Sequence, residues 1–191
     1  MRTDELPQDR DGFRFRGGCN AIDLTATLQA RLSPSPRELL STPRDLARWL
    51  VSAGMTGSAP RTTARDLATA RDLREALYVL AGKRKGAKAE AARKTLNHVA
   101  AGVAAVPCLQ ADGSMHLEGT AGGLLVTLAR EAVLLFGSEA HDRIRQCQSP
   151  TCTIYFIDTS RKGDRRWCSM SACGNRAKID AFRGRKRETD T

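Results

Sequence analysis

The chain has 191 residues, enough for one domain of ordinary size and a small appended module. Hydrophobic residues make up 41% of the chain and charged residues 27%, as in soluble globular proteins. The most apolar segment, residues 124–136, is interrupted by Arg130 and Glu131, and this argues against a membrane span. Because the N-terminus also lacks a signal-peptide pattern, we expect a cytoplasmic protein without a membrane partner.

The net charge of +10 is concentrated near the C-terminus. Residues 160–187 hold ten lysines and arginines against two aspartates, so eight of the ten net charges lie there. Such a concentration is typical of a surface that contacts phosphates, although two or three of the arginines would suffice for solubility or to neutralise a thiolate centre. The candidate nucleic-acid-binding residues are Arg161, Lys162, Arg165, Arg166, Arg176, Lys178, Arg183, Arg185, Lys186 and Arg187.

Residues 1–142 predict a mostly helical domain with a few short strands. Residues 13–15 alternate and favour a short strand, and a helix is expected from residue 20 to residue 32, where Ser33-Pro-Ser-Pro36 ends it. Thr42 and Pro43 supply a hydroxyl cap and a first-turn proline for the next helix. By apolar periodicity and breakers, the later helices are expected at 44–53, 61–80, 87–106, 122–136 and 139–145. Asp112-Gly113 predicts the turn of a hairpin between residues 108 and 118.

Four cysteines form two matched pairs, Cys147-x4-Cys152 and Cys168-x4-Cys173, fifteen residues apart. This spacing favours one structural zinc ion, which takes four sulfur ligands at tetrahedral corners. The alternatives are two disulfides, which a reducing cytosol disfavours, or four unrelated thiols. His141 is a further candidate ligand that four cysteines make unnecessary. Four protein ligands leave no open position for a substrate, and no nucleophile–base set is visible, so we expect a protein that is not an enzyme.

The segment around the cysteines, residues 143–191, predicts a small module that needs its metal to fold. Residues 153–160 favour a strand and residues 161–164 a turn, and a helix is expected after Cys173. Within the module we expect Asn175 to be structural, Gly174 to serve backbone shape and Asp158 to orient Arg161 or Arg166. Most of the four aromatic residues of this segment are expected to form a miniature core over the zinc, with base stacking as the alternative for one of them: Tyr155, Phe156, Trp167 and Phe182.

Several motifs resemble known families. The run Cys168-Ser-Met-x-x-Cys173-Gly-Asn-Arg176, preceded by Phe156-x-Asp-x-Ser-Arg161 and Arg165-Arg-Trp167, resembles the CGNR-type zinc finger over about forty residues. Phe15-x-Gly-Gly-x-x-x-Ile-Asp-Leu24 and Pro43-x-Asp-Leu-x-x-Trp-Leu50 resemble the ABATE domain of stress-induced bacterial transcription regulators. The chain departs from that pattern at Ala26, where the family is expected to have asparagine.

The resemblance implies zinc on the four cysteines and a role in DNA binding. We therefore expect a mainly α fold with a few short β-strands (α+β), comprising an ABATE-like domain over residues 1–142 and a treble-clef-like or knuckle-type zinc module over residues 143–191. The function expected is that of a DNA-binding transcriptional regulator whose N-terminal domain senses a small-molecule effector or dimerises. Since one small finger reads few base pairs, sequence-specific binding would call for a homodimer. The alternative is an adaptor that binds RNA or a protein partner.

Overall fold

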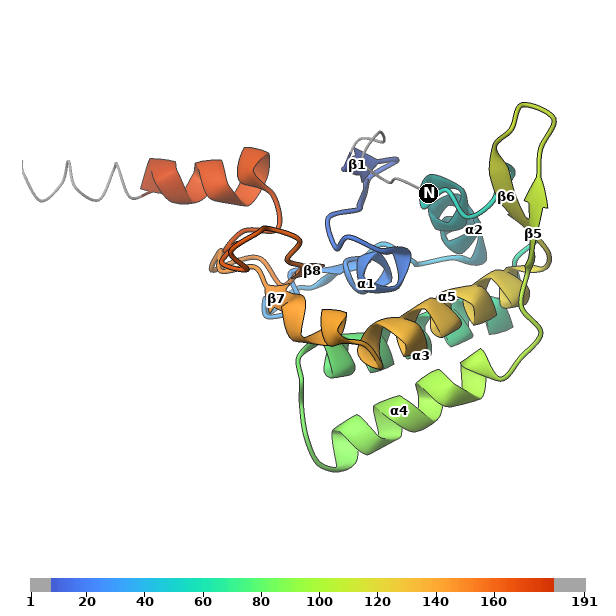
Figure 1. Ribbon diagram of the computed structural model, residues 1–191, viewed down its shortest axis with the longest axis horizontal. Helices are drawn as coiled ribbons and strands as arrows, with labels where there is room; N and C mark the ends of the chain where they lie inside the picture. The colour runs from blue at the N-terminus through green and yellow to red at the C-terminus, as the bar shows by residue number, and fades with distance from the viewer. Residues whose placement is uncertain (1–7, 181–191) are drawn as a thin grey trace, which may run out of the picture.

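The computed structural model describes residues 8–180, and these fold mainly as helices with four short hairpins (Figure 1). The α-helices are α1 (Asn20–Thr25), α2 (Pro43–Ser52), α3 (Ala64–Ala81), α4 (Ala87–Ala100) and α5 (Ala121–Phe136). The antiparallel hairpins are β1 (Asp9–Arg10) with β2 (Phe13–Arg14), β3 (Leu28–Gln29) with β4 (Arg37–Glu38), β5 (Val106–Leu109) with β6 (Met115–Glu118), and β7 (Ile144–Gln146) with β8 (Tyr155–Ile157). The expected helix-dominated α+β fold is confirmed.

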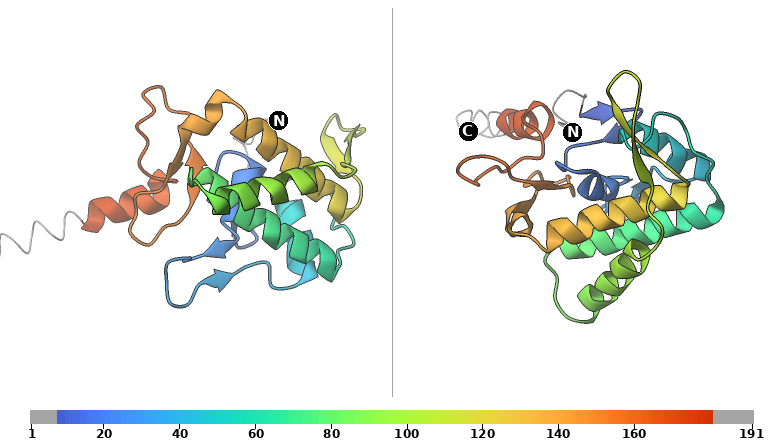
Figure 2. Two further views of the ribbon diagram at one scale, coloured as in Figure 1. Left: turned by 90° about the horizontal axis from the view of Figure 1, so that it is seen from below. Right: turned by 45° about the vertical axis from the view of Figure 1, so that its right-hand side comes forward.

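The main core lies among the helices of the N-terminal region. Helix α3 contacts α1, α2, α4 and α5, so it is the central element of the bundle, and Figure 2 shows α3 and α5 side by side from two directions. Large side chains from each layer are fully buried there: Trp49, Leu73, Leu77, Leu124, Leu125 and Leu128. Each such side chain contributes about 1.5–3 kcal/mol by leaving water. Within residues 8–180, no helix combines the length and the apolarity needed to cross a membrane.

Two helices begin where their caps place them. Thr42 and Asp45 form a reciprocal capping box at α2, with Pro43 in the first turn as expected. Helix α3 begins at Ala64, three residues later than expected, because Thr63 and Asp66 form a second capping box there. The expected hairpin at 108–118 is also present, with Gly113 at its turn in the left-handed region (φ +81°).

The prediction of a helix over residues 20–32 was wrong, because α1 ends at Thr25. The hydroxyls of Thr25 and Thr27 each donate to the carbonyl three residues earlier, at 2.7 Å, and such bonds compete with helix propagation. The following residues instead pair as β3 with β4, and Arg74 of α3 binds the β4 residue Glu38 through both carboxylate oxygens. A tertiary ion pair therefore holds a hairpin where local pattern indicated helix.

Three other expected boundaries were too long. The helix that begins at Ala87 ends at Ala100 rather than at 106, since Val106–Leu109 pairs with β6 and includes Pro107 as a strand residue. The segment expected as a helix over 139–145 is a 3-10 helix, Glu139–Arg143, followed directly by β7. The strand expected over 153–160 covers only Tyr155–Ile157, which are the residues that pair with β7.

The cysteine module packs directly against the helical region. Figure 1 shows β7 and β8 beside α1, and the backbone N–H of Ile157 donates to the carbonyl of Gly17 at 2.8 Å. Tyr155 meets Tyr78 of α3 edge to face, with ring centroids 5.0 Å apart. Both rings belong to a buried cluster that combines residues of the two regions, Ile22, Tyr78, Ala81, Ile144 and Tyr155. The position of the module is thus fixed by apolar contact as well as by hydrogen bonds.

Candidate metal centre and cationic surface

The four cysteines of the predicted site lie together. Their Sγ atoms are all within 4.8 Å of one another, with Cys152 and Cys168 separated by 3.8 Å and Cys168 and Cys173 by 3.7 Å. A tetrahedral ion with metal–sulfur bonds of about 2.3 Å requires sulfur–sulfur distances of about 3.8 Å. The cluster therefore has the dimensions of a four-thiolate zinc site.

Local backbone structure presents each pair of cysteines. Cys147 follows β7 and donates its N–H to Ile154, and Cys152 closes the same loop by donating to Ser149. The second pair lies in the turn that leads through a π-helical segment, Met170–Gly174, into a helix at residues 175–180. Of the two expected arrangements, treble-clef-like and knuckle-type, a hairpin loop that faces the start of a helix corresponds to the treble-clef-like one.

The charge of the cluster also suits a cation. Hydrogen bonds to the sulfurs of Cys147 and Cys152, together with burial, raise the pKa of Cys168, since neighbouring sulfurs disfavour a further negative charge. A bound dication offsets this repulsion and allows four thiolates to coexist. Shape and charge thus both fit one zinc ion, which when bound cross-links the two loops.

Gly174 follows the last cysteine and fills a tight space. A Cβ atom there would lie 2.8 Å from the Met170 Sδ and 3.2 Å from the Trp167 ring. Its backbone is not in the left-handed region, so the expectation that Gly174 serves backbone shape was wrong. A side chain at this position would have to displace the end of the exposed Met170 side chain and press on the Trp167 ring.

Asp158 organises the loop between the cysteine pairs. Its buried carboxylate accepts hydrogen bonds from the backbone N–H groups of Ser160 and Arg165, each at 2.9 Å. Burial raises the pKa of Asp158, but these hydrogen bonds outweigh it and the pKa lies below its usual value. The expectation that Asp158 orients Arg161 or Arg166 was wrong, because its carboxylate binds backbone groups.

Two arginines from other parts of the chain support the module. Arg143 donates to the carbonyls of Asp158 and Ser160, which fixes the loop from the opposite side. Arg16 forms an ion pair with Asp9 and interacts with the Cys168 sulfur. Burial lowers the pKa of Arg16, but Asp9 and Cys168 more than compensate. Nothing in the sequence pointed to Arg16, because it precedes Cys168 by more than 150 residues and is brought there only by folding.

An apolar cluster surrounds the sulfurs. Besides cysteines it contains Ile154, Phe156, the partly buried Trp167 and Ala26, which is 5% exposed. Ala26, the position at which the chain departs from the resembled pattern, therefore packs against the metal centre. Phe156 and Trp167 thus lie in this core as expected, whereas the buried Tyr155 packs in the other cluster, with Tyr78. Phe182, the fourth aromatic residue expected in this core, lies outside the described residues.

Most of the described cationic candidates face solvent. The exposed residues are Arg161, Lys162, Arg166, Arg176 and Lys178. Arg166 donates to the Gln148 side chain at 2.8 Å and lies over the Trp167 ring. Figure 1 shows the helix at residues 175–180 projecting away from the body of the protein, which leaves Arg176 and Lys178 accessible. The remaining candidates, Arg183, Arg185, Lys186 and Arg187, lie outside the described residues.

Arg165 differs from these cations because it is engaged within the module. Its guanidinium donates to the carbonyls of Trp167 and Cys168 and lies over the Phe156 ring. Asn175 is exposed and donates to the Ser171 carbonyl at 3.4 Å from inside the helical segment. His141 is not part of the four-cysteine cluster and packs against Phe136.

Comparison with known proteins agrees with this architecture. Residues 20–139 match the ABATE family model, described as "Putative stress-induced transcription regulator", and residues 143–186 match the CGNR zinc finger model. No curated protein matches the chain. The two models describe a regulator domain and a zinc finger rather than enzymes, and the four-cysteine cluster lies within the finger match. The chain therefore belongs to the ABATE family of transcription regulators and carries a CGNR zinc finger.

Proposed function

We propose that this protein is a cytoplasmic, non-enzymatic transcription regulator that contacts DNA through residues 143–191. Residues 1–142 form the domain that senses an effector or dimerises. Zinc on Cys147, Cys152, Cys168 and Cys173 holds the DNA-contacting surface in shape. In a bacterial regulator of this size, one small finger reads few base pairs, so a homodimer is the form expected to bind a specific site.

The observation that carries the proposal is the set of exposed cations in the module that holds the mostly buried four-cysteine cluster. Arg161 and Lys162 extend from the loop after β8, and Arg176 and Lys178 lie on the projecting helical segment. Cations on a fixed scaffold can bind phosphates at little cost in backbone conformational entropy. An arginine that reaches a guanine edge adds sequence readout. Arg165 has a structural role in this proposal, since two of its guanidinium nitrogens, Nε and Nη2, already donate to carbonyls of the module.

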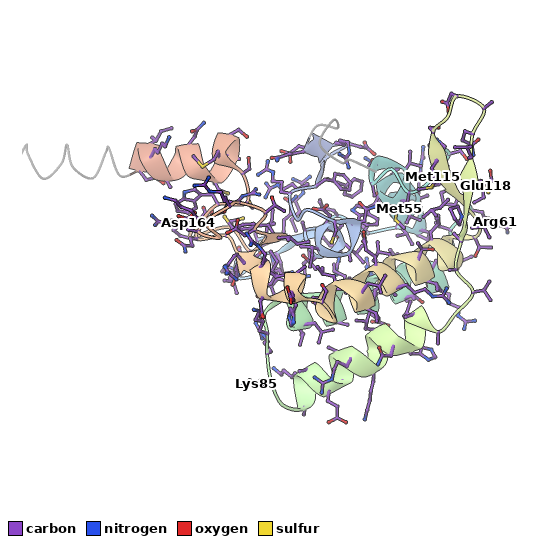
Figure 3. All side chains as sticks on the ribbon, in the orientation of Figure 1. Met55, Arg61, Lys85, Met115, Glu118 and Asp164 are labelled. Carbon is purple, nitrogen blue, oxygen red and sulfur yellow. The ribbon has the colours of Figure 1, made fainter. Side chains whose placement is uncertain are left out.

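The test is selection of the zinc-loaded chain against a random duplex library at physiological salt. An enriched motif that is lost in the R161A/R176A variant supports the proposal, and two half-sites in the motif support the homodimer. Arg61→Ala is the matched control because Arg61 is an exposed arginine without a described partner, and Figure 3 shows it at the end of the molecule opposite Asp164 of the module. Binding should weaken with salt, with a slope that falls by about 1 for each phosphate contact removed.

A second function is favoured by one observation. Met170 and Ile179 are 54% and 51% exposed on the projecting segment, and exposed apolar side chains at such a site suit a protein partner. The module would then act as an adaptor for a protein. The same selection distinguishes the two functions: no enriched duplex, together with capture of a partner that the M170S/I179S variant loses, would replace DNA readout by protein binding.

A further inference from the structure

A cavity of about 450 Å³ lies in the helical region, away from the four cysteines. It is bounded by the end of α3, the middle and second half of α4, the end of α5 and the basic linker between α3 and α4. Its apolar lining comes from Leu80, Leu96, Val133 and Phe136. Cavities of this size accommodate small molecules, and mainly apolar lining is typical of binding pockets.

The mouth of the cavity is strongly cationic. Lys83, Arg84, Lys85 and Arg93 all line it, and no carboxylate does so among the described residues. Lys83 pairs with Asp142 at 3.0 Å. Arg84, Lys85 and Arg93 are exposed and have no ion pair in residues 8–180. Figure 3 shows Lys85 in the linker immediately before α4. Three uncompensated cations beside an apolar hollow make a site that complements a negative charge joined to an apolar body.

Two further polar side chains, Asn97 and His141, line the cavity. His141 packs edge to face against Phe136, with ring centroids 5.3 Å apart, and its Nε2 is buried without a hydrogen-bond partner in the described part of the chain. Buried ring nitrogens are normally hydrogen-bonded, so this one is available to an oxygen atom that enters beside the ring. A ligand oxygen would meet that need.

From these observations we propose that the cavity binds a small amphiphilic carboxylate, with its apolar body against Leu96 and Val133 and its carboxylate at the cationic mouth. A DNA phosphate would also satisfy the cations, but it gives no reason for the apolar lining. This cavity would then be the effector site of the N-terminal domain, and that regulatory role rests on the proposed function.

The cavity is also connected to the cysteine module. Its wall includes Gly137 and His141, which lie before and within the 3-10 helix Glu139–Arg143, and β7 begins at the next residue. The Lys83–Asp142 ion pair joins the cationic mouth to the same segment. A carboxylate that competes for Lys83 would therefore act on the segment that leads into the zinc module.

The test is calorimetric titration of the zinc-loaded full chain, without DNA, with decanoate below its micelle concentration. One decanoate should bind per chain, acetate should not bind detectably, and decyltrimethylammonium should bind at least about tenfold more weakly. Acetate tests whether the carboxylate binds without the apolar body, and decyltrimethylammonium tests whether the site prefers a negative to a positive charge. Naphthoate in place of decanoate shows whether the apolar body is a chain or a ring.

Two variants locate the site. Val133→Asp places a carboxylate in the lining and should weaken decanoate binding about tenfold or more, whereas Leu134→Asp, at the 74% exposed neighbouring residue outside the cavity, should not. Arg93→Glu should also weaken binding, while Lys88→Glu, an exposed cation of α4 outside this cavity, should leave it unchanged. The proposal is overturned if wild type does not bind decanoate, or if V133D and R93E bind it like their controls. Since no DNA is present, these outcomes are independent of whether the finger reads DNA.

Discussion

The carboxylate of Asp23 accepts a hydrogen bond from the backbone N–H of Gly17 at 2.6 Å. The carbonyl of the same glycine accepts from the backbone N–H of Ile157 at 2.8 Å, so a buried acid in α1 is linked to the zinc module through a single residue, Gly17. Asp23 is 5% exposed, and burial raises its pKa to about 7, although bonds from the Gly17 and Arg16 backbone oppose the increase. The contact between the helical region and the zinc module, through Gly17, thus contains a carboxyl group with a pKa near neutral pH.

The raised pKa of Asp23 makes stability depend on pH. In the folded protein the acid keeps its proton up to about pH 7, whereas the unfolded chain releases it near pH 3.8, so the folded state is favoured at low pH and loses this contribution as pH rises towards 7. Between pH 5.5 and pH 7 the wild type should lose about 1–2 kcal/mol of unfolding free energy relative to Asp23→Asn, which cannot titrate. Urea denaturation of both zinc-loaded proteins across this range measures the difference. A constant difference would show that Asp23 ionises normally.

Gly17 should tolerate no side chain. A Cβ atom there would lie 2.6 Å from Cγ2 of the fully buried Ile22, so Gly17→Ala must displace the core or the contact between Gly17 and the zinc module. The substitution should lower the free energy of unfolding by about 1–3 kcal/mol. Gly57→Ala is the control, since its Cβ would make an ordinary 3.5 Å contact with His116. Urea unfolding of the two variants compares them, and equal stabilities would contradict the close packing of Gly17 on Ile22.

Stoichiometric zinc binding should require all four cysteines of the cluster. Cys173→Ser should abolish stoichiometric zinc binding, because three thiolates and a hydroxyl form a weaker site, and the module should lose its fixed structure. Cys108→Ser removes a half-buried thiol of β5, outside the cluster, and should retain one zinc per chain. Elemental analysis of the purified proteins gives the zinc content. Full zinc in C173S would remove Cys173 from the ligand set.

Arg16 should support zinc binding without being a ligand. Its charge lies beside the Cys168 sulfur, so Arg16→Ala should lower zinc affinity about tenfold or more. Arg14→Ala is a matched loss of charge two residues away, without a described partner, and should have little effect. Competition with a chromophoric zinc chelator measures both. If R16A bound zinc as tightly as R14A, the positive charge at Cys168 would have no role in the site.

Local sequence determined the features that depend on neighbouring residues. Two helices were predicted from the Thr42-Pro43 cap and from the apolar periodicity around Leu73 and Leu77, and a four-sulfur cluster was predicted from the cysteine spacing. These predictions were possible because helix caps, periodicity and short loops depend on residues close together in the sequence. The surplus of C-terminal cations was equally evident from the sequence.

Tertiary structure decided everything that required distant segments to meet. Residues 28–29 became a strand rather than helix because Glu38 of their hairpin partner strand is held by Arg74. Arg165 turned inward because carbonyls of Trp167 and Cys168 lie within its reach, and Arg16 reached the cluster from the other end of the chain. The cationic cavity likewise exists only because three helices and a linker enclose it. Burial and charge pairing depend on which residues become neighbours in space, and periodicity along the chain does not record that.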